Sequence, residues 1–246
     1  MSMLRRGNSV ALNPDWVGTS FSEKKIRHAF IRKVYIILCV CCQCLMTCFS
    51  HVCFSLPAKR WVHENIWFYY ISYVTFLVLF IVLYCCPGVR RNYPTNFICL
   101  ALFTLAMSYM TAAISSYHKT NIVLICLGMT TVICFSITLF AFQTKIDFTL
   151  CSGVILVFTL VLLLLGLAIL VVNMTWGSSY IMNCVWGSLA ALLFGLVLVF
   201  DTQMLMGGKK YELSPEEHIY AALNIYLDIV QLFLILLCLL GGGGDS

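Results

Sequence analysis

Charge is what this sequence has least of. Only 10% of its 246 residues are Asp, Glu, Lys or Arg, whereas soluble domains contain about 25%. Hydrophobic residues make up 61% of the chain, and the mean hydropathy is +0.95. Most of this excess lies in long apolar runs. A soluble globular domain is therefore excluded, and a protein with several membrane-spanning segments is predicted.

The sequence also lacks the short motifs of common enzyme classes. It has no GxSxG nucleophile elbow, no HExxH zinc helix and no phosphate-binding loop, and its five histidines show no metal-ligand spacing. We therefore expect no enzymatic activity and no bound cofactor. The net charge of +5 is carried beside the apolar runs, which favours a topology signal over a nucleic-acid-binding surface.

Loop cysteines are scarce, although the chain holds fourteen cysteines in all. Most lie inside apolar runs, as in Cys39–Cys44, where cysteine behaves as a small apolar residue. A disulfide-stabilised secreted fold is therefore not expected. Cys85 and Cys86 stand at a predicted membrane boundary, a position typical of S-palmitoylated cysteines.

Seven apolar segments are long enough to cross a bilayer core, which takes about 20 helical residues. Because lipid offers the backbone no hydrogen-bonding partners, each segment is predicted to be a helix. The predicted fold is an all-α, seven-transmembrane-helix bundle over 34–240, between an N-terminal segment, 1–33, and a flexible tail, 241–246. The segments run over 34–56, 66–86, 95–116, 122–142, 148–172, 180–205 and 219–240.

Two of these segments have informative surfaces. The fifth is apolar on all sides and is predicted to face lipid. The third carries a small, polar face at helical spacing, which indicates close helix packing, with a water-lined pathway as the alternative. That face consists of Thr104, Ser108, Thr111 and Ser115.

Basic residues are distributed unevenly about the segments. The side that holds the N-terminus carries most of them, so the positive-inside rule places the N-terminus in the cytosol. Seven crossings would put the tail on the lumenal or outer side, whereas a re-entrant last segment would leave it cytosolic. The N-terminal side carries Arg5, Arg6, Lys24, Lys25, Arg27, Arg32, Lys33, Arg90, Arg91, Lys145, Lys209 and Lys210; the opposite side carries Lys59, Arg60 and Lys119.

The last segment carries a single polar stripe, formed by Ala221, Asn224, Asp228 and Gln231. Their spacing of three, four and three residues places them on one helix face, which should point into the bundle. Asp228 lies about 15 Å into its segment at about 1.5 Å per residue, near mid-membrane. A carboxylate at that depth must be protonated, paired or hydrated.

The sixth segment is the predicted neighbour of this stripe. Small residues at every fourth position, Gly187, Ala191 and Gly195, allow close approach of another helix. Asp201 follows near the cytosolic end. The connection over 207–217 is short, so the sixth and seventh helices should be adjacent and antiparallel. Its end, Ser214–Glu217, has the composition of a helix start, with a serine cap followed by proline.

Two interpretations of Asp201 and Asp228 are open. In the first, Asp201 caps a helix end or reaches toward the interface, and Asp228 hydrogen-bonds a neighbouring helix. In the second, the two carboxyl groups share a proton, because two acids held close cannot both ionise cheaply. Such a pair would sense cytosolic pH. It would also offer Ca²⁺ a weak, transient metal site, since Ca²⁺ takes about six to eight oxygen ligands.

Arg90 and Arg91 follow the second segment on the side of Asp201. At least one of them is interpreted as a topology charge. The other could act as a latch on Asp201 when that side chain is ionised.

The C-terminal stretch "FDTQMLMGGKKYELSPEEHIYAALNIYLDIVQLFLILL" resembles the hallmark of the lifeguard branch of the Bax-inhibitor (transmembrane Bax inhibitor motif) superfamily. Further matches are "IRHAFIRKVYIIL", "RRNYPTNFICLALFTLAMSYMTAAISSYH" and "FAFQTKIDFT". The resemblance extends over roughly 21–240. The chain differs from the family in a Cys-rich first segment, and it lacks the acid that some relatives carry in the second segment.

The resemblance implies a seven-helix bundle with the last helix at its centre, located in Golgi and endoplasmic reticulum membranes. It implies a pH-sensitive Ca²⁺ leak and suppression of cell death. It assigns the paired aspartates to Asp201 and Asp228, and the latch to Arg90 or Arg91. Expected partners are membrane lipids, calcium ions and apoptosis-regulating membrane proteins. A non-conducting adaptor that blocks death signalling through protein contacts is the alternative, and a cytosolic N-terminus disfavours a seven-helix receptor.

Overall fold

The computed structural model describes residues 14–177 and 179–242, of which most are helical and none forms a strand. Seven helices within these ranges are long and apolar enough to cross a membrane, which confirms the predicted all-α bundle. The elements are α1 (Pro14–Phe54), α2 (Leu56–Glu64), α3 (Ile66–Cys85), α4 (Pro87–Arg91), α5 (Thr95–Ser115), α6 (Thr120–Gln143), the 3₁₀ turn η1 (Phe148–Cys151), α7 (Ser152–Trp176), α8 (Tyr180–Met206) and α9 (His218–Gly241).

The first helix is longer than the predicted segment over 34–56. It runs without a break from Pro14 because no proline or glycine lies between Gly18 and Pro57 to interrupt it. The predicted boundary between residues 33 and 34 therefore falls inside one continuous helix. Arg5, Arg6 and the end of the tail, residues 243–246, lie outside the described residues.

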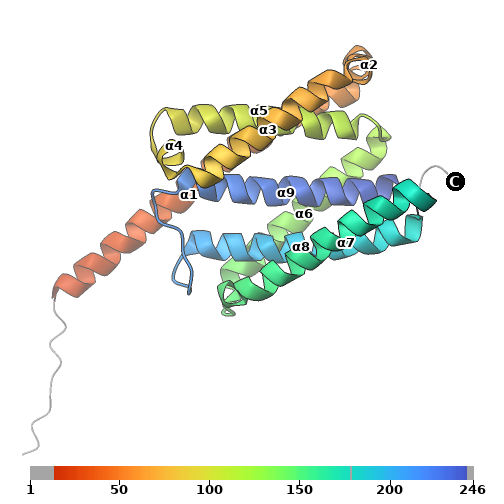
Figure 1. Ribbon diagram of the computed structural model, residues 1–246. Helices are drawn as coiled ribbons and strands as arrows, with labels where there is room; N and C mark the ends of the chain where they lie inside the picture. Colours follow the sequence, from red (N-terminus) through yellow and green to blue (C-terminus); the bar gives the residue numbers. More distant parts are fainter. Residues whose placement is uncertain (1–13, 178, 243–246) are drawn as a thin grey trace, which may run out of the picture.

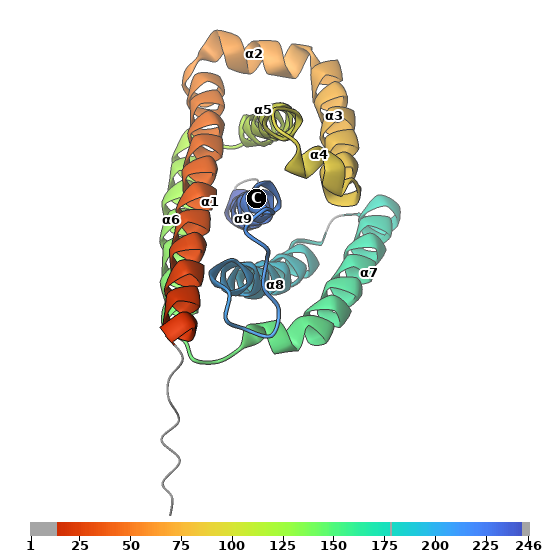
Figure 2. The same ribbon diagram turned by 90° about the vertical axis from the view of Figure 1, so that its left-hand side faces the viewer.

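Helix α9 forms the centre of the bundle, as the family resemblance implies. Figure 2, which looks along the bundle, shows the other long helices arranged around it. Its main contacts are with α8, α1, α6 and α5, and it is the most deeply buried of the seven candidate spans. By contrast, α7 lies at the outside and has few buried residues, which leaves its apolar surface free to contact lipid, as predicted for the fifth segment.

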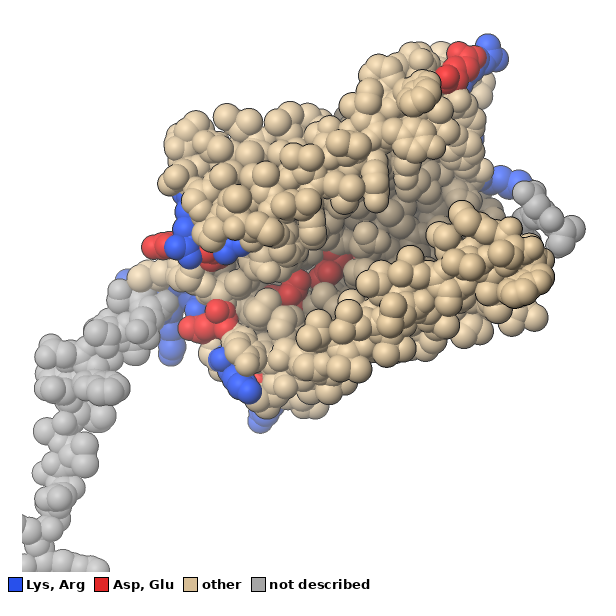
Figure 3. Space-filling view, in the orientation of Figure 1, with Lys and Arg blue, Asp and Glu red and all other residues tan. Residues whose placement is uncertain are grey.

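The two ends of the bundle carry different connections. The α8–α9 connection and α4 lie at the end where α1 begins, and α2 lies at the opposite end (Figure 1). Lys and Arg side chains gather mainly at the first end in Figure 3. The basic residues that the sequence places on one side of the apolar segments therefore also lie mainly at one end of the bundle.

Helix α2 is a difference from the sequence prediction, which treated its residues as a plain connection. It starts with Pro57 in its first turn and lies across the end of the bundle (Figure 2). Val62 is buried, whereas Leu56 and Trp61 are exposed. A short helix with one apolar face suits the boundary between lipid and water, where such helices lie in the membrane plane.

Candidate functional site

A cavity of about 390 Å³ lies between α3, α8 and α9. Figure 3 shows it as part of a groove on the side of the bundle, with acidic atoms at its floor. Its lining combines aromatic and aliphatic side chains with a small group of polar ones. The lining residues are Phe76, Leu77, Phe80, Tyr84, Phe194, Val197, Asp201, Asn224, Leu227, Asp228 and Gln231.

The structure brings the two predicted aspartates together in this cavity. Asp201 comes from α8 and is 8% exposed, and Asp228 comes from α9 and is 4% exposed. Both side chains line the cavity. The Oδ2 atom of Asp228 is buried there without a hydrogen-bonding partner. A buried, unpartnered carboxyl oxygen is costly while the group is charged, so a proton or a bound donor would stabilise it.

Close packing of α8 against α9 brings the two acids into one cavity. A Cβ atom added at Gly187 would lie 2.8 Å from Cδ2 of Leu239, so α9 passes directly over this glycine. Ala191 packs against the central core, and Gly195 faces α6, where an added Cβ would meet Ile137 at 3.4 Å. The predicted small-residue positions therefore serve two neighbouring helices, α9 and α6.

Replacing Gly187 with Leu is expected to destabilise the protein by about 1–3 kcal/mol, the usual effect of overpacking a filled interface. Thermal unfolding in detergent micelles would measure the change. Gly128→Leu is the matched control, because no atom lies within 4 Å of a Cβ added at Gly128 in α6. Equal destabilisation by the two substitutions would contradict the assigned role of Gly187.

The connection between α8 and α9 is set by two glycines and a polar turn. Gly207 and Gly208 adopt φ values of 71° and 72°, which L side chains rarely tolerate, so α8 stops at Met206. The predicted helix start at Ser214 is wrong. Pro215 and Glu216 form a turn, and α9 begins at His218 with Glu217 at its N-cap.

The polar stripe of α9 faces the cavity and the bundle interior. Ala221 is buried. Asn224 and Gln231 line the cavity together with Asp228. The hydroxyl of Tyr84 in α3 donates a hydrogen bond of 2.5 Å to Oδ1 of Asn224. This bond ties α3 to α9 one helical turn away from Asp228. Tyr84 therefore forms one end of the cavity.

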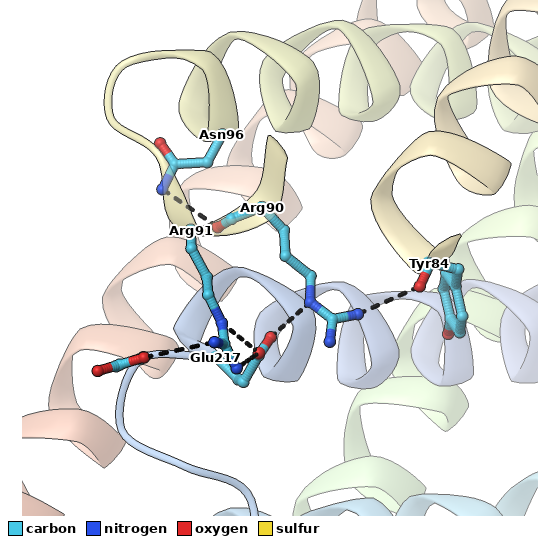
Figure 4. Close-up of polar contacts among 6 residues, drawn as sticks. Tyr84, Arg90, Arg91, Asn96 and Glu217 are labelled. Carbon is cyan, nitrogen blue, oxygen red and sulfur yellow. Dashed lines mark hydrogen bonds and ion pairs between the residues drawn. The ribbon is translucent and has the colours of Figure 1, made fainter. Parts of the chain in front are cut away.

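The structure corrects the predicted partner of the arginines. We expected one of them to bind Asp201; instead, both bind Glu217 (Figure 4). The Nε atom of Arg90 lies 2.6 Å from Oε2 of Glu217, and the Nε atom of Arg91 donates to Oε1 at 2.7 Å. We call these three residues the Glu217 cluster. Because both carboxylate oxygens of Glu217 bind arginines, its side chain does not cap its own helix.

The direction of α4 explains this pairing. Pro87 starts a new short helix after α3, and α4 packs against the beginning of α9. Arg90 also donates to the main-chain oxygen of Tyr84 at 3.2 Å and lies over the ring of Tyr220 at 4.7 Å. Arg90 thus links the Glu217 cluster to the tyrosine at the end of the cavity.

Arg91 remains charged in this cluster at physiological pH. Hydrogen bonding and charge attraction from Glu217 raise the pKa of Arg91 above its already high value.

Glu217 and Tyr84 are the residues of this site that the sequence interpretation missed. Glu217 was taken for an ordinary acid of a helix start. It lies four residues before Ala221, so it extends the spacing of the polar stripe by one member, and this was the available signal. Tyr84 ends an apolar run, where a tyrosine is typical of the membrane interface, so no signal set it apart.

The donor set of the cavity bears on its use as a metal site. Two carboxyl groups line the cavity, whereas Ca²⁺ takes about six to eight oxygen ligands. No group of three or more His, Cys, Asp or Glu side chains with metal-binding geometry occurs among the described residues. The cavity could hold a cation only weakly, with water or amide oxygens completing its shell.

Comparison with known proteins agrees with this architecture. The family profile described as "Inhibitor of apoptosis-promoting Bax1" matches residues 27–245. The chain belongs to the Bax inhibitor family. Within this family it is 39% identical to human protein lifeguard 3 over 96% of this chain and 75% of the relative. It is 39% identical to mouse protein lifeguard 3, over 90% of this chain and 71% of the relative.

A third member of the Bax inhibitor family, mouse protein lifeguard 4, is 34% identical over 86% of this chain and 84% of its own length. These matches confirm the resemblance on which the sequence interpretation relied. The chain is thus a multi-pass membrane protein of a family described by inhibition of apoptosis. Neither that description nor the names of the relatives denote an enzyme.

Proposed function

We propose that this chain is a pH-sensitive Ca²⁺ leak channel that lowers organelle calcium and thereby suppresses apoptosis. One observation carries the proposal: two buried acids from neighbouring helices line the same cavity. The ion pairs of the described residues all use Glu212, Glu216 or Glu217 instead. Acids inside a membrane are costly, and they are retained where ions or protons pass.

The state of the pair would control the passage of cations. While Asp201 and Asp228 share a proton, they carry one negative charge and hold α8 to α9. Loss of that proton leaves two carboxylates that repel each other and can replace part of the hydration shell of Ca²⁺. Two carboxylates plus the amide of Gln231 make a weak site, and weak binding permits release as well as entry. Flux should therefore increase as pH rises.

Other titratable groups face the pair from the surrounding helices. Tyr84 approaches both acids from α3, and Cys134 approaches Asp228 from α6. Neither a tyrosine nor a cysteine gains charge between mild acid and neutral pH at its ordinary pKa. The two carboxyl groups are therefore the groups to which we assign the pH response.

The orientation and location are part of the same proposal. The end of the bundle with the Glu217 cluster and most basic residues would face the cytosol, because translocated ends are poor in Lys and Arg. The first residues, up to about the start of the apolar part of α1, would then be cytosolic. Placement in Golgi or endoplasmic reticulum membranes follows the resemblance to lifeguard proteins. Glycosylation mapping of sites added at each terminus would test it, and a modified N-terminus would reject it.

Reconstitution in liposomes tests conduction itself. Purified protein in vesicles loaded with a Ca²⁺-sensitive dye should let external Ca²⁺ enter, at a rate proportional to the amount of protein. Protein-free vesicles and vesicles with an unrelated seven-helix protein provide the controls. Ca²⁺ entry equal to that of the controls, at every pH, would reject the proposed leak.

The alternative hypothesis, a non-conducting adaptor, predicts a different result in cells. If protein contacts alone suppress apoptosis, a chain carrying both Asp201→Asn and Asp228→Asn should protect cells as well as the unmodified chain. Under our proposal, protection is lost together with the lowering of organelle calcium. Cell survival and organelle calcium would be measured in the same cells at matched expression.

A further inference from the structure

The cavity with the acid pair opens on the side of the bundle, not only toward its ends. In Figure 3 the groove lies between α3 and α7, along the face that lipid chains would cover, and acidic atoms are visible at its floor. Leu77 of α3 lines the cavity and is 37% exposed. A molecule dissolved in the bilayer could therefore reach Asp201 and Asp228 without passing through water.

The lining of the cavity is divided into two parts. Three side chains of α3 and three from α8 and α9 form apolar walls, and the polar part consists of the two acids, the amides of Asn224 and Gln231, and Tyr84. The walls are Phe76, Leu77, Phe80, Phe194, Val197 and Leu227. Such a division suits a ligand that has an apolar chain and a polar head.

The charge of the floor selects the head group. Under the proposed function the two carboxyl groups share a proton and carry one negative charge. Arg90, which contacts the main chain of the cavity residue Tyr84, is bound to Glu217. The Oδ2 atom of Asp228 is buried without a hydrogen-bonding partner. A hydrogen bond from a charged donor stabilises such a buried, unpartnered acceptor more than a bond from a neutral donor does. A primary ammonium group provides one positive charge and three N–H donors, which matches Asp201, Asp228 and the amide oxygen of Gln231.

We propose that this cavity binds a single-chain lipid with a primary amine, which enters from the bilayer. Its ammonium group lies between Asp201 and Asp228, and its chain lies along the apolar walls. The volume of about 390 Å³ is within the range of small-molecule sites, about 300–1,000 Å³. A transmembrane helix of a partner, about 10 Å across, is too wide. The inference rests on the proposed function in one respect: a bound amine would occupy the cation site and block the leak.

Photolabelling in lipid nanodiscs tests this proposal. The probe is octadecylamine with a diazirine in its chain, and the control probe is the corresponding octadecanol, which has the same chain and no charge. The amine should label the cavity walls about tenfold more than the alcohol, since one charge-assisted hydrogen bond is worth roughly that factor. Peptide mass spectrometry locates the label. Equal labelling by the two probes, or labelling spread over the outside of α7, would overturn the proposal.

Variants separate the contribution of the acids from that of the walls. The double change Asp201→Asn and Asp228→Asn should reduce amine labelling to the level of the alcohol. Leu227→Trp keeps both acids and fills the cavity, so it should abolish labelling by both probes; Leu77→Trp serves the same purpose if that chain does not fold. Leu164→Trp on the lipid face of α7, where Leu164 is 65% exposed, should change nothing. Amine labelling that survives either the double change or the filled cavity would overturn the proposal.

The labelling readout needs no Ca²⁺ gradient, so it stands apart from the test of conduction. A chain that binds the amine but passes no Ca²⁺ rejects the leak and retains this site. A chain that passes Ca²⁺ but labels equally with amine and alcohol rejects the lipid site alone.

Discussion

A chain carrying Glu217→Ala is expected to be roughly 3 kcal/mol less stable than the unmodified protein, because removing one partner of a buried ion pair strands the other. The side chain of Glu217 is 7% exposed and that of Arg90 is 16% exposed. Without Glu217, Arg90 retains only the main-chain oxygen of Tyr84 and the ring of Tyr220. Unfolding in bicelles by increasing amounts of denaturing detergent would measure the loss.

Glu212→Ala is the matched control for this prediction. Glu212 also pairs with an arginine, Arg27, at 3.1 Å, but its side chain is 50% exposed. Exposed ion pairs contribute about 0–1 kcal/mol, so this change should have little effect. If both substitutions destabilise the protein equally, the Glu217 cluster does not have the role that we assign to it.

Asp228→Asn is expected to reduce Ca²⁺ flux at neutral pH by at least about tenfold. Asparagine has nearly the volume of aspartate and keeps an amide oxygen, so the packing of α9 should survive. It removes one charge-assisted contact to the ion, which is worth roughly a factor of ten or more. Flux into liposomes at a fixed Ca²⁺ gradient would measure the change, with thermal unfolding as the check on folding.

Asp147→Asn provides the control for that experiment. Asp147 lies outside the cavity, in the connection before η1, where it accepts hydrogen bonds from Thr149 and from the main-chain N–H of Lys210. These bonds hold its pKa below the usual range, so it is ionised at neutral pH like any surface acid. Its neutralisation should leave flux unchanged. A comparable loss of flux would show that flux depends on acidic residues in general and not on Asp201 and Asp228 in particular.

The membrane-spanning helices were predictable because the thickness of the lipid core fixes how long an apolar run must be. The predicted segment over 95–116 corresponds to α5 (Thr95–Ser115) and that over 180–205 to α8 (Tyr180–Met206). The inward direction of the polar stripe was predictable for a similar reason, since a charged side chain cannot face lipid cheaply.

The partners of side chains across helices were less predictable. Asp201 and Glu217 are both acids, and the sequence does not say which of them Arg90 meets. The direction of α4 after Pro87 decides it, and that direction depends on packing against α5 and α9. The predicted start of α9 at Ser214 was wrong for a related reason. Both arginines bind Glu217, and a turn at Pro215 precedes the helix.

The most direct test of the central claim is Ca²⁺ flux measured against pH, for the unmodified chain and for Asp201→Asn and Asp228→Asn. The pH on the cytosolic side would be varied between about 5 and 8, the range in which a carboxyl group that shares a proton can titrate. We expect flux of the unmodified protein to rise with pH and the profiles of both variants to be flat. Variants that retain the rise of the unmodified protein would contradict a gate built from Asp201 and Asp228.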